Sequence, residues 1–443
     1  MRTRTCLPRL MPLLFGLLVN GVHAGSATGV PPTFMSLYEA TLASNPVLKG
    51  REFGVDQAVA QKDIVRSRLL PQLSSVGNYS WNDYHDRLVG DQSYSGRRGT
   101  VQARQALLDL TSYFRLQGAK YSVLQSQQEV GAIRTGLAGE LLDRYLLVLQ
   151  GEDDIRYLQA EKESIETQLK RLRVMRERQL VKITDLYEVE AYYEALLTKE
   201  IEARNFEAVA RERLRETSGV AVSRLSPMER LEFAQTPGGE DQWVNEAVAR
   251  NPSLTALQYA IDAAREIVAS ARAEHVPQVA LTLSSTYSDQ GYDNRQQPPY
   301  RVGTVGVQVT IPIFEGGRVQ GSVNDAVARY EMARQQYEAA RREIERETRT
   351  AYLSANASYA RMASTRREVE ALEKAVDGQQ KMYERGLTTI VDLLDNRQRL
   401  VKARSGQSKA RYDFVRDWAS LRIRAGSLTA DDLKELDNWL RGG

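Results

Sequence analysis

Two aspartates in the last part of the chain, Asp392 and Asp395, have a spacing at which their carboxylates could act together. Three residues apart in a helix, they lie on one face. If several copies of the chain surround an axis, each aspartate forms a ring of carboxylates, and such rings bind and select cations. A second interpretation stays open, in which Asp392 caps the helix and Asp395 lies on a solvated face.

The residues around this pair predict the tip of a helix hairpin. Gly386 can end one helix in the left-handed conformation, and Thr389 can cap the next helix, with Asp392 in the capping-box position. The segment 178–186 repeats this pattern at an offset of 207 residues, with Gln179 in place of Gly386. We therefore expect two hairpin tips, near 179–185 and near 385–392.

The whole chain is duplicated, because other motifs recur at an offset of 206 residues. Asn45-Pro46 matches Asn251-Pro252, and Leu70-Pro71-Gln72-Leu73 matches Val276-Pro277-Gln278-Val279. A repeat of this length is a duplicated half-protein and far exceeds a solenoid repeat. The expected organisation is a signal peptide at 1–24, a first structural repeat at 25–230 and a second at 231–443.

The first 24 residues have the features of a secretory signal: three arginines, an apolar run and a cleavage site that ends in a small residue. Without those arginines, 57 basic residues balance 57 acidic ones, so the net charge does not indicate a nucleic-acid partner. The one cysteine, Cys6, lies inside the signal, so we expect a mature protein without disulfides or a lipid anchor. After the signal no run of eighteen apolar residues occurs, so a membrane could be crossed only by strands.

Two long proline-free stretches, 72–226 and 313–443, predict long helices. In the second, Val323, Tyr330, Tyr337, Ile344 and Ala351 recur every seven residues. In the first, a similar apolar seam at 155–172 is interrupted by Lys162. A helix from about 111 to 178 would be roughly 100 Å long, and its apolar stripe is narrow, which suits a single-layer wall with water on each face. A dimeric coiled coil is the alternative.

Alternating apolar and polar residues predict two pairs of strands between the helices, at 72–88 and 98–110 and at 277–289 and 300–313. Aromatic residues gather near these strands: Tyr79, Trp81, Tyr84, Tyr287, Tyr292 and Tyr300. Such strands are typical of an outer-membrane barrel, although a soluble four-stranded sheet is the alternative. Since four strands cannot close a barrel, the membrane interpretation requires eight strands from a dimer or twelve from a trimer.

The sequence resembles the TolC-like outer-membrane factors, a channel family of type I secretion and tripartite efflux. The resemblance rests on the two Asn-Pro pairs, the two Leu-Pro-Gln-Leu-like motifs, the segment 305–317 and the segment 386–395. It implies a mainly α fold with a small β part, in which long coiled-coil helices are duplicated and each chain adds four transmembrane strands. It also implies a homotrimer with a shared twelve-stranded barrel in outer-membrane lipid, and an α-helical tunnel in the periplasm of a Gram-negative bacterium.

The resemblance also implies partners and roles for residues at the tips. The expected partners are a periplasmic adaptor protein and an inner-membrane transporter, driven by ATP or by protons. Asp392 and Asp395 match the acidic constriction of the family. The other matched residues are Thr184, Asp185, Tyr383 and Thr388 in the gate network, and Leu180, Gly386 and Leu387 at tips that dock the adaptor. Thr388 stands where well-known members carry an arginine, so the usual ion pair between chains cannot form.

Enzyme signatures are absent from the sequence, so we expect no catalytic residue, cofactor or metal site. The three histidines, His23, His85 and His275, include no pair at ligand spacing. The predicted function is a passive exit channel for substrates driven by the transporter. A periplasmic coiled-coil scaffold or adaptor without a pore is the alternative, and the sequence leaves open whether proteins, drugs or metals are exported.

Overall fold

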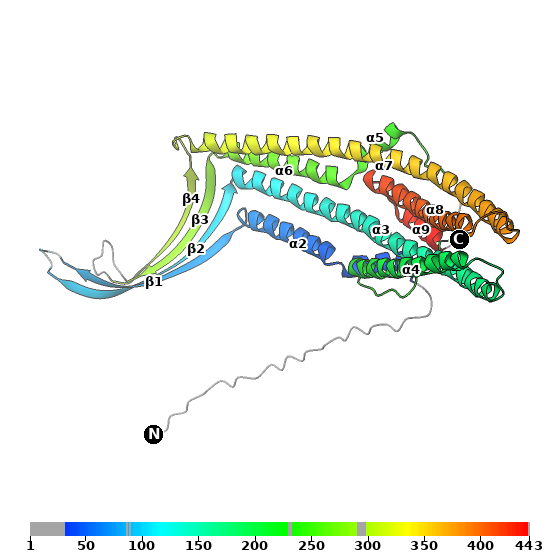
Figure 1. Cartoon of the computed structure of the whole chain (residues 1–443). Coiled ribbons are helices and arrows are strands. Elements are labelled where there is room, and N and C mark those ends of the chain that lie inside the picture. Colours follow the sequence, from blue (N-terminus) through cyan, green and yellow to red (C-terminus); the bar gives the residue numbers. More distant parts are fainter. Residues whose placement is uncertain (1–31, 86, 88–89, 229–232, 290–297, 442–443) are drawn as a thin grey trace, which may run out of the picture.

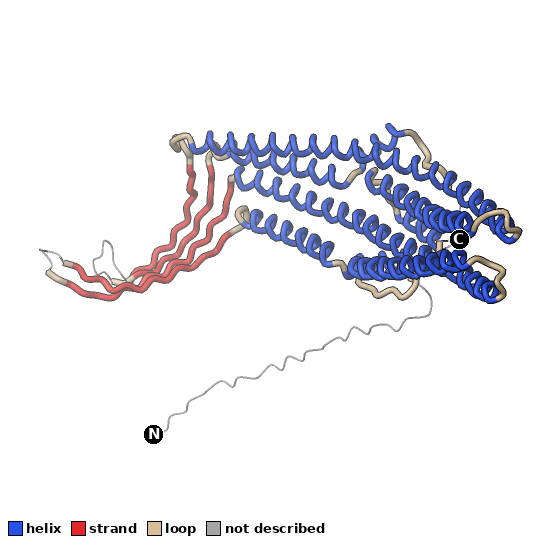
Figure 2. The backbone as a smooth tube through the Cα atoms, in the orientation of Figure 1, coloured by secondary structure: helices blue, strands red, loops and turns tan. Residues whose placement is uncertain are grey.

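The computed structural model describes residues 32–85, 87, 90–228, 233–289 and 298–441. The signal expected at 1–24 lies outside these residues. The molecule is elongated, with a curved sheet at one end and long helices that run away from it (Figure 1). Figure 2 shows that the strands occupy one end of the molecule and the helices occupy the rest of it. Among the helices described, none is both long and apolar enough to cross a membrane.

The elements follow the same order twice, with one further helix at the end. The first pass comprises α1 (Phe34–Ser44), α2 (Pro46–Ser67), β1 (Gln72–Tyr84), β2 (Gln92–Leu108), α3 (Leu110–Glu177) and α4 (Ile183–Ser218). The second comprises α5 (Glu240–Arg250), α6 (Pro252–Ala273), β3 (Gln278–Ser288), β4 (Tyr300–Thr310), α7 (Arg318–Glu384) and α8 (Ile390–Arg424), followed by α9 (Ala430–Arg441).

The repeated Asn-Pro pairs start α2 and α6. Asn45 Oδ1 accepts hydrogen bonds from the backbone N–H groups of Val47 and Leu48, at 2.9 and 3.2 Å. Asn251 Oδ1 accepts one from the N–H of Ser253, at 2.9 Å. The proline that follows each asparagine occupies the first helical position, where no N–H is needed. The other repeated motif contains the glutamines that begin β1 and β3, Gln72 and Gln278.

The four strands form one antiparallel sheet in the order β1-β2-β3-β4. β1 and β4 are its edges: within the described residues β1 pairs only with β2, and β4 pairs only with β3. Large apolar side chains on the sheet are exposed, and Trp81 and Val305 are each more than 70% accessible (72% and 74%). One chain therefore leaves both the edges and an apolar surface of this sheet uncovered.

The strand boundaries differ from the expected ranges chiefly in the first pair. β2 begins at Gln92 and not at 98, because the polar residues 92–95, predicted as a loop, continue the ladder opposite Trp81–Tyr84. The Ser93 hydroxyl donates to Asp83 Oδ1 at 2.7 Å. β1 ends at Tyr84, and the expected end at 88 lies outside the described residues. β4 ends at Thr310 and not at 313, because Pro312 has no N–H for the ladder.

The helices form a wall that continues from the sheet. α2, α3, α6 and α7 lie side by side next to the strands (Figure 1). β2 stops at Leu108, two residues before its expected end, because Asp109 caps α3 through the N–H of Ser112, at 2.8 Å. α3 has 68 residues and matches the predicted long helix within one residue at each end. Beyond the middle of the molecule, α3 pairs with α4 as the first hairpin and α7 pairs with α8 as the second hairpin.

Two clusters of buried side chains join the hairpins. In the middle core, α1, α9 and the segment before α5 cover one face of α3 and α8, with Phe34, Tyr145 and Trp439 at its centre. The rings of Phe34 and Tyr145 meet edge to face at 6.0 Å. In the tip core, Leu172 and Leu186 of the first hairpin lie in one cluster with Ile390 and Leu393 of the second.

Candidate functional site at the hairpin tips

The tip of the second hairpin has the predicted turn. Gly386 has a φ of 70°, in the left-handed region, and the N–H of Leu387 donates to the carbonyl of Met382 at 3.0 Å. The Thr389 hydroxyl accepts from the N–H of Asp392 at 3.2 Å, while the Thr389 N–H donates to the Asp392 carboxylate at 3.3 Å. This is a complete capping box. The interpretation of Asp392 as a helix cap is therefore confirmed.

The first tip forms the same turn without a glycine. Gln179 has a φ of 58°, in the left-handed region. Among the described residues, every other residue with a positive φ is a glycine. The N–H of Leu180 donates to the carbonyl of Met175 at 2.9 Å, as Leu387 does to Met382 in the other tip. The two copies therefore share one turn geometry, although the first has Gln179 where the second has glycine, the residue that adopts this conformation most readily.

Thr388 and Asp392 belong to a short chain of hydrogen bonds on the second tip. Gln379 Nε2 donates to the Thr388 hydroxyl at 2.7 Å, and that hydroxyl donates to Asp392 Oδ2 at 3.1 Å. Hydrogen bonds from Thr389, and a further one from Thr388, lower the pKa of Asp392 from its ordinary value of 3.8. Asp395 is exposed on α8, three residues further on. The structure thus places two carboxylates at the tip, one of them held ionised by its donors.

The other residues expected in the gate network lie where the two tips meet. Tyr383 is half-buried at the margin of the tip core, and burial together with the nearby Asp185 carboxylate raises its pKa. The Thr184 hydroxyl lies 3.5 Å from Asp185 Oδ1. The Thr388 hydroxyl is engaged with Gln379 and Asp392 on its own tip.

The outermost residues of both tips are apolar and exposed. Leu180 is 65% exposed and Leu387 is 67% exposed. The two leucines hold equivalent positions, each directly after the residue in the left-handed conformation. Gly386 has no atom near the position of a Cβ, so its role is conformational. Each tip therefore exposes one leucine side chain, at equivalent positions, at the end of the molecule.

Two ion pairs above the tips were not predicted, although one of their residues was noted. Lys162, the residue that interrupts the apolar seam of α3, contacts the buried carboxylate of Glu200 on α4. Hydrogen bonds from Lys162 and Arg204 lower the pKa of Glu200 to about 2. Arg397 of α8 contacts Glu161 of α3 across the hairpins, at 3.4 Å. In both pairs the sequence signal is a basic residue, Lys162 in α3 or Arg397 in α8, at a position where the helix repeat has apolar residues.

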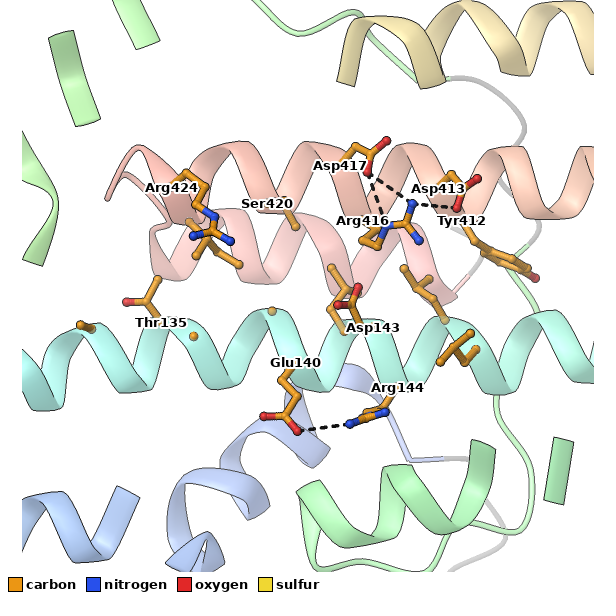
Figure 3. Close-up of a pocket in the computed structure, with 18 of the residues that line it drawn as sticks. Thr135, Glu140, Asp143, Arg144, Tyr412, Asp413, Arg416, Asp417, Ser420 and Arg424 are labelled. Atoms are coloured by element: carbon orange, nitrogen blue, oxygen red, sulfur yellow. Dashed lines mark hydrogen bonds and ion pairs between the residues drawn. The ribbon is translucent and has the colours of Figure 1, made fainter. Parts of the chain in front are cut away.

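A cavity of about 730 Å³, lined by both charged and apolar side chains, lies higher in the wall, between α3, α8 and the start of α6 (Figure 3). Arg416 pairs there with Asp413 and Asp417, at 2.9 and 3.4 Å. Burial raises the pKa of Asp417, and also that of Asp143 across the cavity. These charges lie on α3 and α8 outside the middle core. Among the described residues there is no group of three or more His, Cys, Asp or Glu side chains arranged to hold a metal ion.

The chain is similar to known proteins along most of its length. The family model described as outer membrane efflux protein matches residues 37–220 and 243–427. The outer membrane protein TolC of Escherichia coli is 28% identical, over 98% of this chain and 89% of that protein. The alkaline protease secretion protein AprF of Pseudomonas aeruginosa is 27% identical, over 96% and 90%.

Solved structures have the same fold. A crystal structure of CusC, described in connection with transmembrane channel formation, superposes with a TM-score of 0.80 at 16% sequence identity. The superposition covers 90% of this chain and 93% of that one. The duplicated order of helices and strands is therefore shared by proteins whose sequences have diverged widely.

Proposed function

The chain belongs to the outer membrane efflux protein family, and from this premise we propose that three copies of it form one passive duct across the outer membrane and the periplasm. It is an outer-membrane channel-tunnel for efflux and secretion.

The unpaired edges of the sheet support a barrel shared between chains. A strand edge in lipid leaves N–H and C=O groups without partners, so β1 and β4 need neighbours. Four strands are too few to close a barrel. β1 of one copy paired with β4 of the next gives a closed ring, of eight strands in a dimer or twelve in a trimer. The family resemblance favours three copies.

The wall of helices suits a water-filled tunnel. The middle core covers one face of α3 and α8, and we assign this face to the outside of the tunnel. The charged residues around the cavity in Figure 3 then belong to the inside. A lumen of paired charges and polar side chains stabilises water along the path. The duct itself supplies no energy, which comes from an inner-membrane transporter driven by ATP or by protons.

The tips serve as the gate in this proposal. Around the threefold axis, Asp392 and Asp395 form two acidic rings that bind cations. Contacts involving Thr184, Asp185 and Tyr383 hold the two tips together in the closed state, and Thr388 orders the second tip through Gln379 and Asp392. Leu180 and Leu387 are the exposed apolar points that a periplasmic adaptor protein contacts. Docking of the adaptor then favours separation of the tips.

We do not propose a periplasmic scaffold without a pore. The family to which the chain belongs and the open edges of the sheet, β1 and β4, both favour a channel. One relative is named for protease secretion and the family for efflux, so the proposed cargo includes proteins exported by type I secretion and small molecules.

The test is single-channel conductance of the mature protein in a planar bilayer, with divalent cations added on each side. The natural chain is expected to give small, cation-selective currents that divalent cations block. The double variant Asp392→Asn/Asp395→Asn is expected to conduct without this block. No current from a folded, membrane-extracted oligomer would overturn the proposed channel, and a block that survives in the double variant would remove the acidic rings from it.

A further inference from the structure

Arg397 occupies a position in α8 where the helix repeat calls for an apolar residue. Ile390, Leu394 and Val401 are spaced by four and seven residues along the buried side of α8, and Arg397 stands between the last two. Lys162 interrupts α3 in the same way, between Leu158 and Ile165. A charged group at one seam position lowers the stability of a coiled coil but fixes which residues face each other.

The two cations differ in what they join. Lys162 contacts Glu200 of α4, and Arg204 Nη2 donates to the same carboxylate at 2.6 Å. That cluster lies within the first hairpin. Arg397 of α8 instead reaches across to α3, where Nη1 donates to Ser164 Oγ at 2.8 Å and lies 3.4 Å from Glu161 Oε1. Its Nη2 donates to Gln380 Oε1 of α7, at 3.2 Å.

The link between the hairpins is well shielded from water. The side chains of Arg397 and Glu161 are 13% and 12% exposed. Another ion pair between the hairpins, Arg171 with Glu384, is 70% and 49% exposed at 3.7 Å, so solvent weakens it. Shielding makes the buried pair costly to break on one side, since the remaining charge stays without compensation. The planar guanidinium also fixes geometry better than an ammonium group does.

We propose that Arg397 is a positioning residue of the gate, which holds the α8 tip and its carboxylates against the first hairpin in the closed state. This inference rests on the proposed function of the tips. Asp395 precedes Arg397 by two residues and Asp392 by five, so a displacement of Arg397 moves both carboxylates. Opening requires the guanidinium to leave Glu161 and Ser164 while it keeps Gln380, which lies on its own hairpin. The uncharged Thr388, bonded within its own tip, makes no comparable link.

The experiment compares resting conductance in planar bilayers, without adaptor, for four variants. Glu161→Gln and Arg397→Gln are each expected to raise the ratio of open to closed channel on the order of tenfold, the factor associated with loss of one charge-assisted hydrogen bond. Ser164→Ala, which removes one contact and no charge, is expected to raise it less. The double variant Glu161→Arg/Arg397→Glu is expected to return conductance toward that of the natural chain.

Glu200→Gln is the matched control. It breaks the buried ion pair between Glu200 and Lys162, which lies inside the first hairpin and next to Glu161 along α3. It is expected to lower thermal stability but to leave resting conductance unchanged. If Glu200→Gln opens the channel as much as Glu161→Gln does, general loosening explains the effect and the positioning role is overturned. Natural conductance in both Glu161→Gln and Arg397→Gln overturns it as well. If these variants behave like the natural chain while Asp392→Asn/Asp395→Asn loses the cation block, the proposed gate stands and only this inference fails.

Discussion

The hydroxyl group of Tyr412 on α8 donates a hydrogen bond to Asp153 Oδ2 on α3, at 2.7 Å, inside the middle core. Arg411 and Arg156 lie 3.5 and 2.8 Å from the same carboxylate. The Asp153 side chain is 4% exposed. This cluster therefore joins the two hairpins far above the tips.

We expect Asp153→Asn to lower the free energy of unfolding by about 3 kcal/mol, since Arg411 would keep a buried charge without its partner. Thermal unfolding of the purified oligomer in detergent measures the change. Asp431→Asn is the control, because Asp431 pairs with Lys434 at a side chain that is 90% exposed. The control is expected to stay within about 0.5 kcal/mol. Equal losses in the two variants would contradict the role assigned to the cluster.

The two tips predict opposite effects of glycine. Gln179→Gly is expected to stabilise the first tip by about 1 kcal/mol, because glycine adopts the left-handed conformation without a steric penalty. Gly386→Ala is expected to destabilise the second tip by about the same amount. Hydrogen exchange at the amides of Leu180 and Leu387, which donate across each turn, reports the local change. Slower exchange of Leu387 in Gly386→Ala would show that this account of the turns is wrong.

The part of the cation block that depends on Asp392 is expected to persist to a lower pH than it would without the hydrogen bonds to this carboxylate. Because the folded pKa of Asp392 lies below 3.8, its charge is kept as the pH falls past that value and is lost only lower. Thr389→Ala removes the hydroxyl that lowers this pKa most and keeps the backbone N–H donor, so the block in this variant should fade at a higher pH than in the natural chain. Thr388→Val removes a lesser donor and should shift the profile less. Conductance recorded over a series of pH values measures both. Identical profiles would mean that these hydrogen bonds do not set the charge.

Glu200 predicts a contribution to stability that depends on pH. Its pKa is depressed from 4.5 to about 2 in the folded chain, so the contribution is complete above pH 4.5 and is lost as the pH falls through 2. Melting temperatures between these pH values should fall more steeply for the natural chain than for Glu200→Gln. The comparison fails if both chains lose stability in parallel.

The sequence predicted those parts of the fold that depend on local chemistry. The proline-free stretch 72–226 and its apolar seam predicted α3 within one residue at each end. The Asn-Pro pairs were a mark of the duplication, and the structure shows that they start α2 and α6. The outer part of β2 was missed because Gln92 and its neighbours are polar, and a polar strand outside a core has the composition of a loop.

The candidate site was predictable to the same degree. Gly386, Thr389 and Asp392 form a turn whose contacts are all local, so its geometry followed from spacing. The pairing of Arg397 with Glu161 spans 236 residues and depends on which face of α8 meets α3. Nothing in a single sequence fixes that face, so the pair was not predicted.

The unpaired edges of β1 and β4 have a genetic consequence. Copies that must share one barrel associate after synthesis, without regard to the gene copy that encoded them. A cell that makes both the natural chain and a chain with a broken edge strand therefore builds mostly mixed barrels. In such a barrel the defective chain interrupts the ring for its intact neighbours as well. A lesion that would be recessive in a monomeric protein is thus expected to be dominant here, and more so as the altered allele is expressed more strongly.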